Sequence, residues 1–587
     1  MKVYYHLAIR VTRLTRGKFV DLLTDLLALL LFVFLTLFIT WPLIKFAREF
    51  VVGWVGDNYY FGWLIAWYQK SIFELHRLPL SVPFLNYPEG WNIAYNDMTP
   101  AMVAIALPAS LVAGSTFGYN FSLWVSFVLS GFGVYAWVKR LTRHPAASMV
   151  AGTIFAFAPY RMSHLFGHFN LMGTQWFPLY FLFLTDLLAS KDKSWKSACL
   201  AAIFLGLIGF TSQYYLYMTL VISVCYAGFY LVFFDHKLLK NPGFWKNLAV
   251  FLILSFLSVY LSVMPYLQLY GQEDIPARSL KEVRIWSANP TDFILPSREH
   301  FLWGSWFENI FGRNLWIENS LYVGCITLVL AVLAFFRRKQ IEGLNPVIKL
   351  LVLMSFLSFL LALGTDLHWF GNPVRIDLPN FLRKWNPPPR SMIHLPGFYL
   401  FKFLPFYNRM RIWMRYGVFT LLFLSVLAGI GATWLMKYVK PRLTGLVTLV
   451  LLVLVVIDFY PRTPLLSKVT GRPVDYWLRD QPGEGAVTQF PLWQVTVPEQ
   501  AYYTQVYNKP FMGSFSAFPP PQLQRVAPIL NSFPDRESLA LLQDLGVQWV
   551  IMDSATYPDF ESIETGIEAL DLKPVAIFDS LYVYEIK

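Results

Sequence analysis

Charged residues are scarce in this chain: only 14% of its 587 residues are Asp, Glu, Lys or Arg, while 56% are hydrophobic. In soluble domains about a quarter of the residues are charged. The composition therefore excludes a wholly soluble protein and indicates a multi-spanning membrane protein with a soluble part. Cysteine is scarcer still, and we interpret Cys199, Cys225 and Cys325 as small apolar side chains within apolar runs, with no bearing on redox compartment.

The basic residues do not form one patch, although the net charge is +12. Lysine and arginine occur in short clusters between apolar runs, where membrane topology requires them. The sequence has no basic stripe with interleaved aromatics, so we expect no nucleic acid as a partner. It also has no evident internal repeat, which weighs against a transporter built from duplicated halves.

Long apolar runs dominate the first 460 residues. A membrane-spanning helix needs about 20 apolar residues. The first run follows several basic residues, exceeds a signal-peptide core and lacks a cleavage site, so we predict an uncleaved span with a cytoplasmic N-terminus. About eleven spans are predicted, centred on 26–44, 121–138, 146–160, 175–190, 197–212, 214–234, 247–269, 319–336, 347–364, 415–436 and 443–460.

One apolar stretch, Thr99–Ala113, is short and contains Pro108. If it lies in the interface, all five basic clusters between spans fall on the cytoplasmic side, as the positive-inside rule favours. We therefore predict a cytoplasmic (inner) membrane protein with an extracytoplasmic C-terminal part and long outer loops. The five clusters are Lys139/Arg140/Arg143, Lys191/Lys193/Lys196, Lys237/Lys240/Lys246, Arg337/Arg338/Lys339 and Lys437/Lys440/Arg442.

The composition changes after Tyr460. Residues 1–460 form the predicted transmembrane domain, including an outer loop 45–120 with interfacial helices, and residues 461–587 a small extracytoplasmic α/β domain. The elements predicted in this domain are a helix at Ser538–Leu545 that ends at Gly546, a strand at Val547–Met552, and a hairpin of Val575–Phe578 with Leu581–Ile586.

Two carboxylates lie in the first outer loop. Asp57 directly follows the first span and precedes Tyr59–Leu75, which we interpret as an amphipathic interfacial helix. A charge near a bilayer is costly and usually functional, so Asp57 is a candidate catalytic base. Asp97 precedes Thr99–Ala113 and is a second candidate, as a base or as a ligand of a hydroxyl or a metal. The alternative for both is a helix N-cap.

The second outer loop carries Arg161, His164 and His168. The two histidines are four residues apart and share a face on a helix. This spacing allows a zinc pair, but the Glu of an H-E-x-x-H motif is missing and no third ligand is apparent. Binding of phosphate or sugar hydroxyls fits the set better.

Polar and aromatic residues also alternate in the third outer loop. Arg284, Glu299 and His300 could bind sugar hydroxyls while Trp286, Trp303 and Trp306 stack on sugar rings. The alternative is an aromatic belt at the membrane interface.

Arg409, Arg411 and Arg415 precede a span on the predicted outer face, where the positive-inside rule disfavours arginine. We predict that they bind a lipid phosphate or pyrophosphate. Arg411 and Arg415 are four residues apart and would share one face of a helix. The alternative is anchoring to anionic headgroups.

These segments together resemble a known family. The chain is similar to the GT-C superfamily of polytopic membrane glycosyltransferases, near the YfhO-like bacterial membrane proteins. The resemblance covers most of the chain, and its matching pieces are Gly56-Asp57, Asn96-Asp97, Ala158-Pro159-Tyr160-Arg161 with His164 and Gly167-His168, Leu404-Pro405-Phe406 before Arg411 and Arg415, Pro473–Leu478 and Leu545-Gly546-Val547.

The resemblance implies a polyprenyl-phosphate sugar donor, a glycan, lipid or protein acceptor, and inverting transfer with Asp57 as base. A divalent ion (Mg or Mn) is a possible cofactor in such enzymes. Here the second outer loop offers histidines and no carboxylate, which puts that metal role in doubt. Two other functions stay open: a transporter or flippase of lipid-linked glycans, and a non-catalytic envelope assembly protein.

Overall fold

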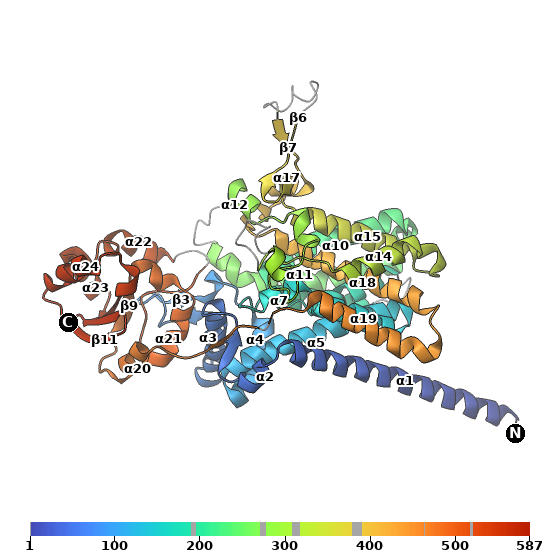
Figure 1. The fold of residues 1–587 in the computed structure, drawn as a ribbon, viewed down its shortest axis with the longest axis horizontal. Coiled ribbons are helices and arrows are strands. Elements are labelled where there is room, and N and C mark those ends of the chain that lie inside the picture. The colour runs from blue at the N-terminus through green and yellow to red at the C-terminus, as the bar shows by residue number, and fades with distance from the viewer. Residues whose placement is uncertain are drawn as a thin grey trace.

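The computed structural model describes residues 2–189, 195–270, 277–307, 317–377, 390–462, 464–516 and 520–587. A bundle of helices forms most of the molecule, and a smaller domain of helices and strands lies at one end (Figure 1). The first helix extends from the bundle in the opposite direction, so the N-terminus and the C-terminal domain lie at opposite ends of the long axis (Figure 1).

The bundle consists of apolar helices. Among the described residues, seven are long and apolar enough to cross a membrane, and five more are apolar but shorter. The seven are α1 (Lys2–Ile39), α5 (Ser115–Thr142), α10 (Gln213–Phe233), α11 (Pro242–Tyr270), α15 (Asn345–Ala362), α18 (Gly417–Met436) and α19 (Thr444–Phe459). The shorter five are α4 (Pro100–Ala113), α6 (Pro145–Ala156), α8 (Trp176–Ala189), α9 (Trp195–Gly209) and α14 (Cys325–Phe336).

Each of the eleven predicted spans overlaps one of these helices. The remaining helix, α4, is the short apolar stretch that was predicted to lie in the interface. The protein is thus an α-helical polytopic membrane protein. Helix α11 shows the expected surface, since most of its apolar side chains face outward as they would toward lipid.

Two of the contacts made by the basic clusters join different helices of the bundle. Lys139 of α5 pairs with Asp25 of α1 at 2.7 Å. Lys437, after α18, donates to the carbonyl of Gln340, which follows α14. The second contact brings the clusters at 337–339 and 437–442 together, and the cytoplasmic side of all the clusters stays a prediction. Lys191 and Lys193 lie outside the described residues.

The outer loops fold into short elements. The first contains α2 (Leu43–Phe46), β1 (Phe50–Val52), α3 (Asp57–Gln69), β2 (Ser81–Val82) and β3 (Trp91–Asn92), and the second contains α7 (Pro159–His164). The later loops contain α12 (Leu280–Ile285), α13 (Gly304–Phe307) and α17 (Pro396–Phe403). They also contain two small hairpins, β4 (His368–Trp369) with β5 (Asn372–Pro373) and β6 (Arg375–Asp377) with β7 (Arg390–Met392).

The helix predicted at Tyr59–Leu75 is confirmed as α3 and a following π-helical turn, Lys70–Glu74. The prediction that this helix is amphipathic and faces lipid is wrong. Ten of the thirteen α3 residues are buried, because the C-terminal domain covers the face expected to contact lipid. The helix is therefore held rigidly between bundle and domain.

The C-terminal domain is built on a four-stranded sheet of order β11–β12–β10–β9. Strands β9 (Ala486–Phe490) and β10 (Val547–Asp553) are parallel, whereas β12 (Leu581–Glu585) is antiparallel to both β10 and β11 (Pro574–Phe578). The predicted helix, strand and hairpin are confirmed by α23 (Arg536–Asp544), β10 and β11–β12. The other helices are α20 (Pro473–Asp480), α21 (Glu499–Tyr507), α22 (Pro521–Leu530) and α24 (Phe560–Glu568).

The domain and the first outer loop share one hydrophobic core. Trp63 of α3 and Val550 of β10 belong to the same cluster of buried side chains. Strand β1 pairs with β8 (Leu466–Lys468), and Leu85 forms a parallel bridge with Phe511. The C-terminal domain therefore fixes the position of α3 and of its first residue, Asp57.

Candidate active site

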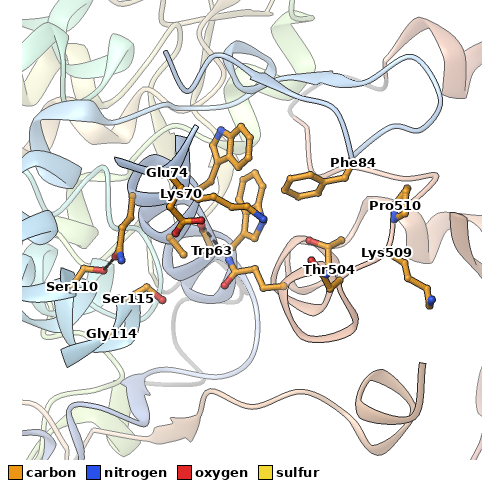
Figure 2. Close-up of a pocket in the computed structure, with 15 residues that line it drawn as sticks. Trp63, Lys70, Glu74, Phe84, Ser110, Gly114, Ser115, Thr504, Lys509 and Pro510 are labelled. Atoms are coloured by element: carbon orange, nitrogen blue, oxygen red, sulfur yellow. Dashed lines mark hydrogen bonds between the residues drawn. The ribbon is translucent and has the colours of Figure 1, made fainter. Parts of the chain in front are cut away.

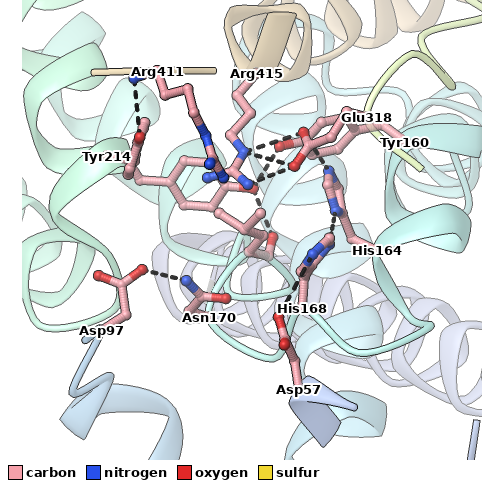
Figure 3. A network of polar contacts seen from close by, with 12 residues as sticks. Asp57, Asp97, Tyr160, His164, His168, Asn170, Tyr214, Glu318, Arg411 and Arg415 are labelled. Atoms are coloured by element: carbon pink, nitrogen blue, oxygen red, sulfur yellow. Dashed lines mark hydrogen bonds and ion pairs between the residues drawn. The ribbon is translucent and has the colours of Figure 1, made fainter. Parts of the chain in front are cut away.

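A polar cavity of about 470 Å³ lies between the outer loops, where the helical bundle meets the C-terminal domain. Two carboxylates and four arginines line it, an arrangement that combines proton acceptors with a concentrated positive charge. Its polar lining includes Asp57, Asp97, His168, Asn170, Gln213, Tyr214, Arg278, Arg409, Arg411 and Arg415. Figure 3 shows Asp57, Asp97, His168, Asn170, Tyr214, Arg411 and Arg415.

Asp57 is the first residue of α3 and lies in the first turn, where the helix dipole favours a negative charge. The second outer loop passes directly over it. A Cβ on Gly53 would lie 2.5 Å from the carbonyl of Phe166, and one on Gly167 would lie 3.7 Å from the Cβ of Asp57, so glycine allows the two loops to approach. Gly56 occupies the N-cap position of α3, and the Asp57 carboxylate lies 3.9 Å from His168 Nε2.

Asp97 lies half-buried on the other side of the cavity. The side-chain amide of Asn170 donates a hydrogen bond to its carboxylate (Figure 3). Burial raises the pKa of both Asp57 and Asp97, while His168 and Arg415 at Asp57, and Asn170 and Arg415 at Asp97, act in the opposite direction. Both carboxylates are thus better proton acceptors than a solvated aspartate.

A chain of polar side chains runs from Asp57 into the protein (Figure 3). His168 Nδ1 lies 2.8 Å from His164 Nδ1, and His164 Nε2 lies 3.7 Å from a Glu318 oxygen. Arg415 Nε contacts both oxygens of Glu318 at 3.1 Å. Burial alone would raise the pKa of Glu318, but Arg415 and His164 outweigh it and lower that pKa to about 2. Burial lowers the pKa of both histidines, so one imidazole can donate to the other.

The predicted shared helical face of Arg411 and Arg415 is wrong. Arg411 lies in an extended stretch, and Arg415 in a 3-10 turn, Met414–Tyr416, that precedes α18. Both side chains nevertheless line the same cavity (Figure 3). The Arg411 guanidinium stacks 5.0 Å from the Trp286 ring centroid, and Arg415 lies 4.9 Å from that of Tyr214. Aromatic faces therefore orient both guanidinium groups.

Arg161 does not line the cavity. It is buried and donates to the carbonyl of Ala156 at 2.9 Å and of Met172 at 3.4 Å, and it lies over the Phe127 ring. Since Ala156 and Met172 stand at the two ends of the second outer loop, Arg161 holds the loop that carries the histidines.

Arg284, Glu299 and His300 also lie away from the cavity lining. Arg284 donates to the buried carboxylate of Asp366 at 2.7 Å. The Glu299 side chain pairs with Arg298, and His300 Nδ1 accepts from the backbone of the residues that follow it. These contacts stabilise outer loops, and a role in substrate binding stays a prediction.

Several cavity residues escaped sequence reasoning. Asn170, Gln213, Tyr214 and Arg278 line the cavity and were not expected there. Glu318, which was not expected either, does not line the cavity but pairs with Arg415, which does. Glu318 had a signal, since it is an acidic residue directly before the span at 319–336, as Asp57 is directly after the first. Asn170 and Gln213 are neutral residues without a distinguishing pattern.

One group of described residues offers three metal-ligating atoms within 4.8 Å, namely His164, His168 and Glu318. Glu318 supplies the third ligand that the sequence did not reveal. Two nitrogens and a carboxylate suit zinc and not Mg or Mn, which prefer oxygen. Glu318 is already paired with Arg415, whose charge would repel a dication. The donor set does not fit Mg or Mn, and we derive no step through a metal.

A second cavity, of about 520 Å³, lies between α3, the start of α5 and α21 (Figure 2). Its wall combines Trp63 and Phe84 with Lys70, Thr504 and Lys509. The Lys509 ammonium donates to the carbonyl of Gln481 at 3.0 Å, so its charge is directed into the domain. None of the residues predicted from sequence lies in this cavity.

The fold, a helical bundle with folded loops and a terminal α/β domain, is similar to that of a solved glycosyltransferase. Arabinofuranosyltransferase AftD from Mycobacteria matches at a TM-score of 0.55 and 13% identity, over 96% of this chain and 41% of its own. The chain thus spans about two fifths of that protein.

Two further solved structures match less well. The oligosaccharyltransferase of Archaeoglobus fulgidus, tethered with an acceptor peptide, has a TM-score of 0.48 and 12% identity, over 91% of this chain and 69% of its own. ArnT from Cupriavidus metallidurans has a TM-score of 0.40 and 14% identity, over 95% of this chain and 97% of its own.

The chain belongs to the family described as a domain of unknown function (DUF6311), which matches residues 26–430. No curated protein matches the chain. The narrower resemblance to YfhO-like proteins stays a prediction.

Proposed function

We propose that this protein is a membrane glycosyltransferase. It transfers a sugar from a polyprenyl-phosphate donor to an acceptor hydroxyl on the outer face of the cytoplasmic membrane. The observation that carries this proposal is the single cavity that brings Asp57 and Asp97 together with Arg278, Arg409 and Arg411. A cationic wall suits a phosphate leaving group, and a half-buried carboxylate suits a proton acceptor.

In the proposed reaction, Asp57 accepts the proton of the acceptor hydroxyl. The resulting oxygen attacks the anomeric carbon of the donor, and the bond from that carbon to the phosphate oxygen breaks. The phosphate leaves with the bonding electrons, and the arginines stabilise the charge that develops on it. His168, 3.9 Å from Asp57, orients the carboxylate. Asp97, fixed by Asn170, binds a sugar hydroxyl.

The raised pKa of Asp57 supports its role as base, because general-base catalysis is most efficient when the pKa approaches the working pH. The other reading of Asp57, a helix N-cap, has less support because Gly56 holds the N-cap position of α3 and Asp57 is the first helical residue. Arginines that bind the donor phosphate would also orient the donor, so that its anomeric carbon faces the attacking oxygen.

The test is mass spectrometry of lipid-linked sugars and envelope glycans from cells that lack the protein. Restoring the wild type should restore one glycan product and consume one polyprenyl-phosphate sugar. Asp57→Asn should restore neither while being inserted at a normal level. Asp559→Asn, at an exposed helix N-cap in the C-terminal domain, is the matched control and should behave as wild type. A normal product with Asp57→Asn would remove Asp57 as base and leave Asp97 as the next candidate.

A further inference from the structure

A third cavity, of about 410 Å³, lies within the C-terminal domain. Gln489, near the end of β9, and Asp553, the last residue of β10, both line it. Because β9 and β10 are parallel, their carboxyl ends meet at one edge of the sheet. Ligands of open α/β sheets bind outside this edge. The turn Asp579–Ser580 between β11 and β12 closes the cavity on one side.

Buried side-chain amides form one wall. Gln489, Gln494 and Gln500 are 3%, 5% and 3% exposed. Gln500 donates to Gln489 at 2.9 Å, Gln489 donates to Gln494, and Gln494 donates to the Asp553 carboxylate at 3.1 Å. Buried polar networks are costly unless their members are satisfied, and they hold their groups in fixed directions. The network therefore presents preorganised polar groups to the cavity.

An exposed indole stands beside these amides. Trp493 lines the cavity and is 60% exposed, on the turn that also carries Gln494. Planar amides and carboxylates next to an accessible aromatic face match the two surfaces of a sugar, its hydroxyl edge and its C–H face. We propose that this cavity binds a neutral saccharide, with Trp493 stacking on a ring and Asp553 and Gln500 bonding its hydroxyls.

The charges at the cavity exclude an anionic ligand. Glu499, Asp553 and Asp579 line it, and its one arginine, Arg472, is paired with the buried Asp475 at 2.8 Å. Phosphates and acidic sugars would be repelled. The site goes beyond the proposed transfer: it would hold a glycan chain in the domain that also fixes α3. Binding is measured without any donor, so its failure and the failure of the transferase proposal are separate results.

The experiment is calorimetric titration of the full chain in detergent micelles with maltotetraose, mannotetraose, xylotetraose and chitotetraose, and with glucose 6-phosphate. At least one tetrasaccharide should bind with a Kd below about 1 mM, and glucose 6-phosphate should not bind. Trp493→Ala should weaken the binding at least ~10-fold, which is about 1.4 kcal/mol, and Trp493→Phe should weaken it less.

The matched control is Trp195→Ala, which removes another exposed indole, 57% accessible, at the start of α9. It should leave the affinity unchanged. The proposal is overturned if none of the four tetrasaccharides binds the wild type, if Trp493→Ala binds as tightly as the wild type, or if glucose 6-phosphate binds more tightly than they do. Asp553→Asn, which keeps the side-chain shape, gives a second reading: full retention of affinity would also count against the site.

Discussion

Replacing Glu318 by glutamine should destabilise the protein by about 3 kcal/mol at neutral pH. The Glu318 and Arg415 side chains are only 5% and 9% exposed. Arg415 lowers the pKa of Glu318 from 4.5 to about 2, which corresponds to roughly 3 kcal/mol by linkage. Removing one partner of a buried pair costs about 3–5 kcal/mol, because the other charge stays buried without compensation. Glutamine keeps the shape and one acceptor but not the charge.

The measurement is unfolding of purified protein by titration with SDS in mixed micelles, followed by circular dichroism. The matched control is Glu299→Gln, which breaks the more exposed pair with Arg298, side chains 21% and 37% exposed. Such a pair contributes about 0–1 kcal/mol. Equal stability of Glu318→Gln and Glu299→Gln would refute the assignment of Glu318 as the buried counter-ion of Arg415.

The pH dependence gives an independent check. Because the pKa of Glu318 is depressed in the folded state, its contribution is fully present above pH 4.5 and is lost as the pH falls toward about 2. The stability difference between wild type and Glu318→Gln should therefore be constant from pH 5 to 7 and shrink below 4.5. A difference that grows on acidification would contradict the argument.

Three further outcomes are expected. Transfer should slow as the pH falls through a pKa above 3.8, because burial raises the pKa of Asp57 and its protonated form accepts no proton; Asp57→Asn should cost roughly 10²–10⁴-fold in rate. Arg411→Lys and Arg415→Lys should each weaken donor binding at constant charge, because lysine cannot bind phosphate bidentately; unchanged donor affinity in both would exclude them. Reporter fusions at Lys339 and Lys587 should report opposite sides of the membrane, and the same side for both would overturn the topology.

The helical bundle was readable from the sequence because membrane spans carry a strong and local signal. Every predicted span has a helix, and in the C-terminal domain Gly546, at φ +70, ends a helix where glycine was expected to end it. The environment of α3 could not be predicted from the sequence. Its aromatic residues suit a lipid interface and a protein core equally well, and only the C-terminal domain, more than 400 residues further on, decides between them.

The site was predictable in part. Asp57, Asp97 and the arginines at 409, 411 and 415 are conspicuous because charges are rare beside membrane spans. Arg284, Glu299 and His300 met the same criterion, yet the contacts described for them are with other groups of the protein and not with the cavity. A charge pattern shows that a residue needs a partner and does not show whether that partner is a substrate or the protein itself.

Arg411 and Arg415 illustrate this limit most sharply. The sequence treats them as equivalent, four residues apart, on an assumed helix. In the structure the charge of Arg415 is compensated by Glu318 in a bidentate contact, whereas Arg411 is oriented by the uncharged face of Trp286. A donor phosphate therefore gains more net attraction from Arg411, because Glu318 offsets the field of Arg415 at short range. Arg415 instead couples the cavity to His164 through Glu318, so the two arginines that look alike in the sequence differ in what they contribute to binding an anion.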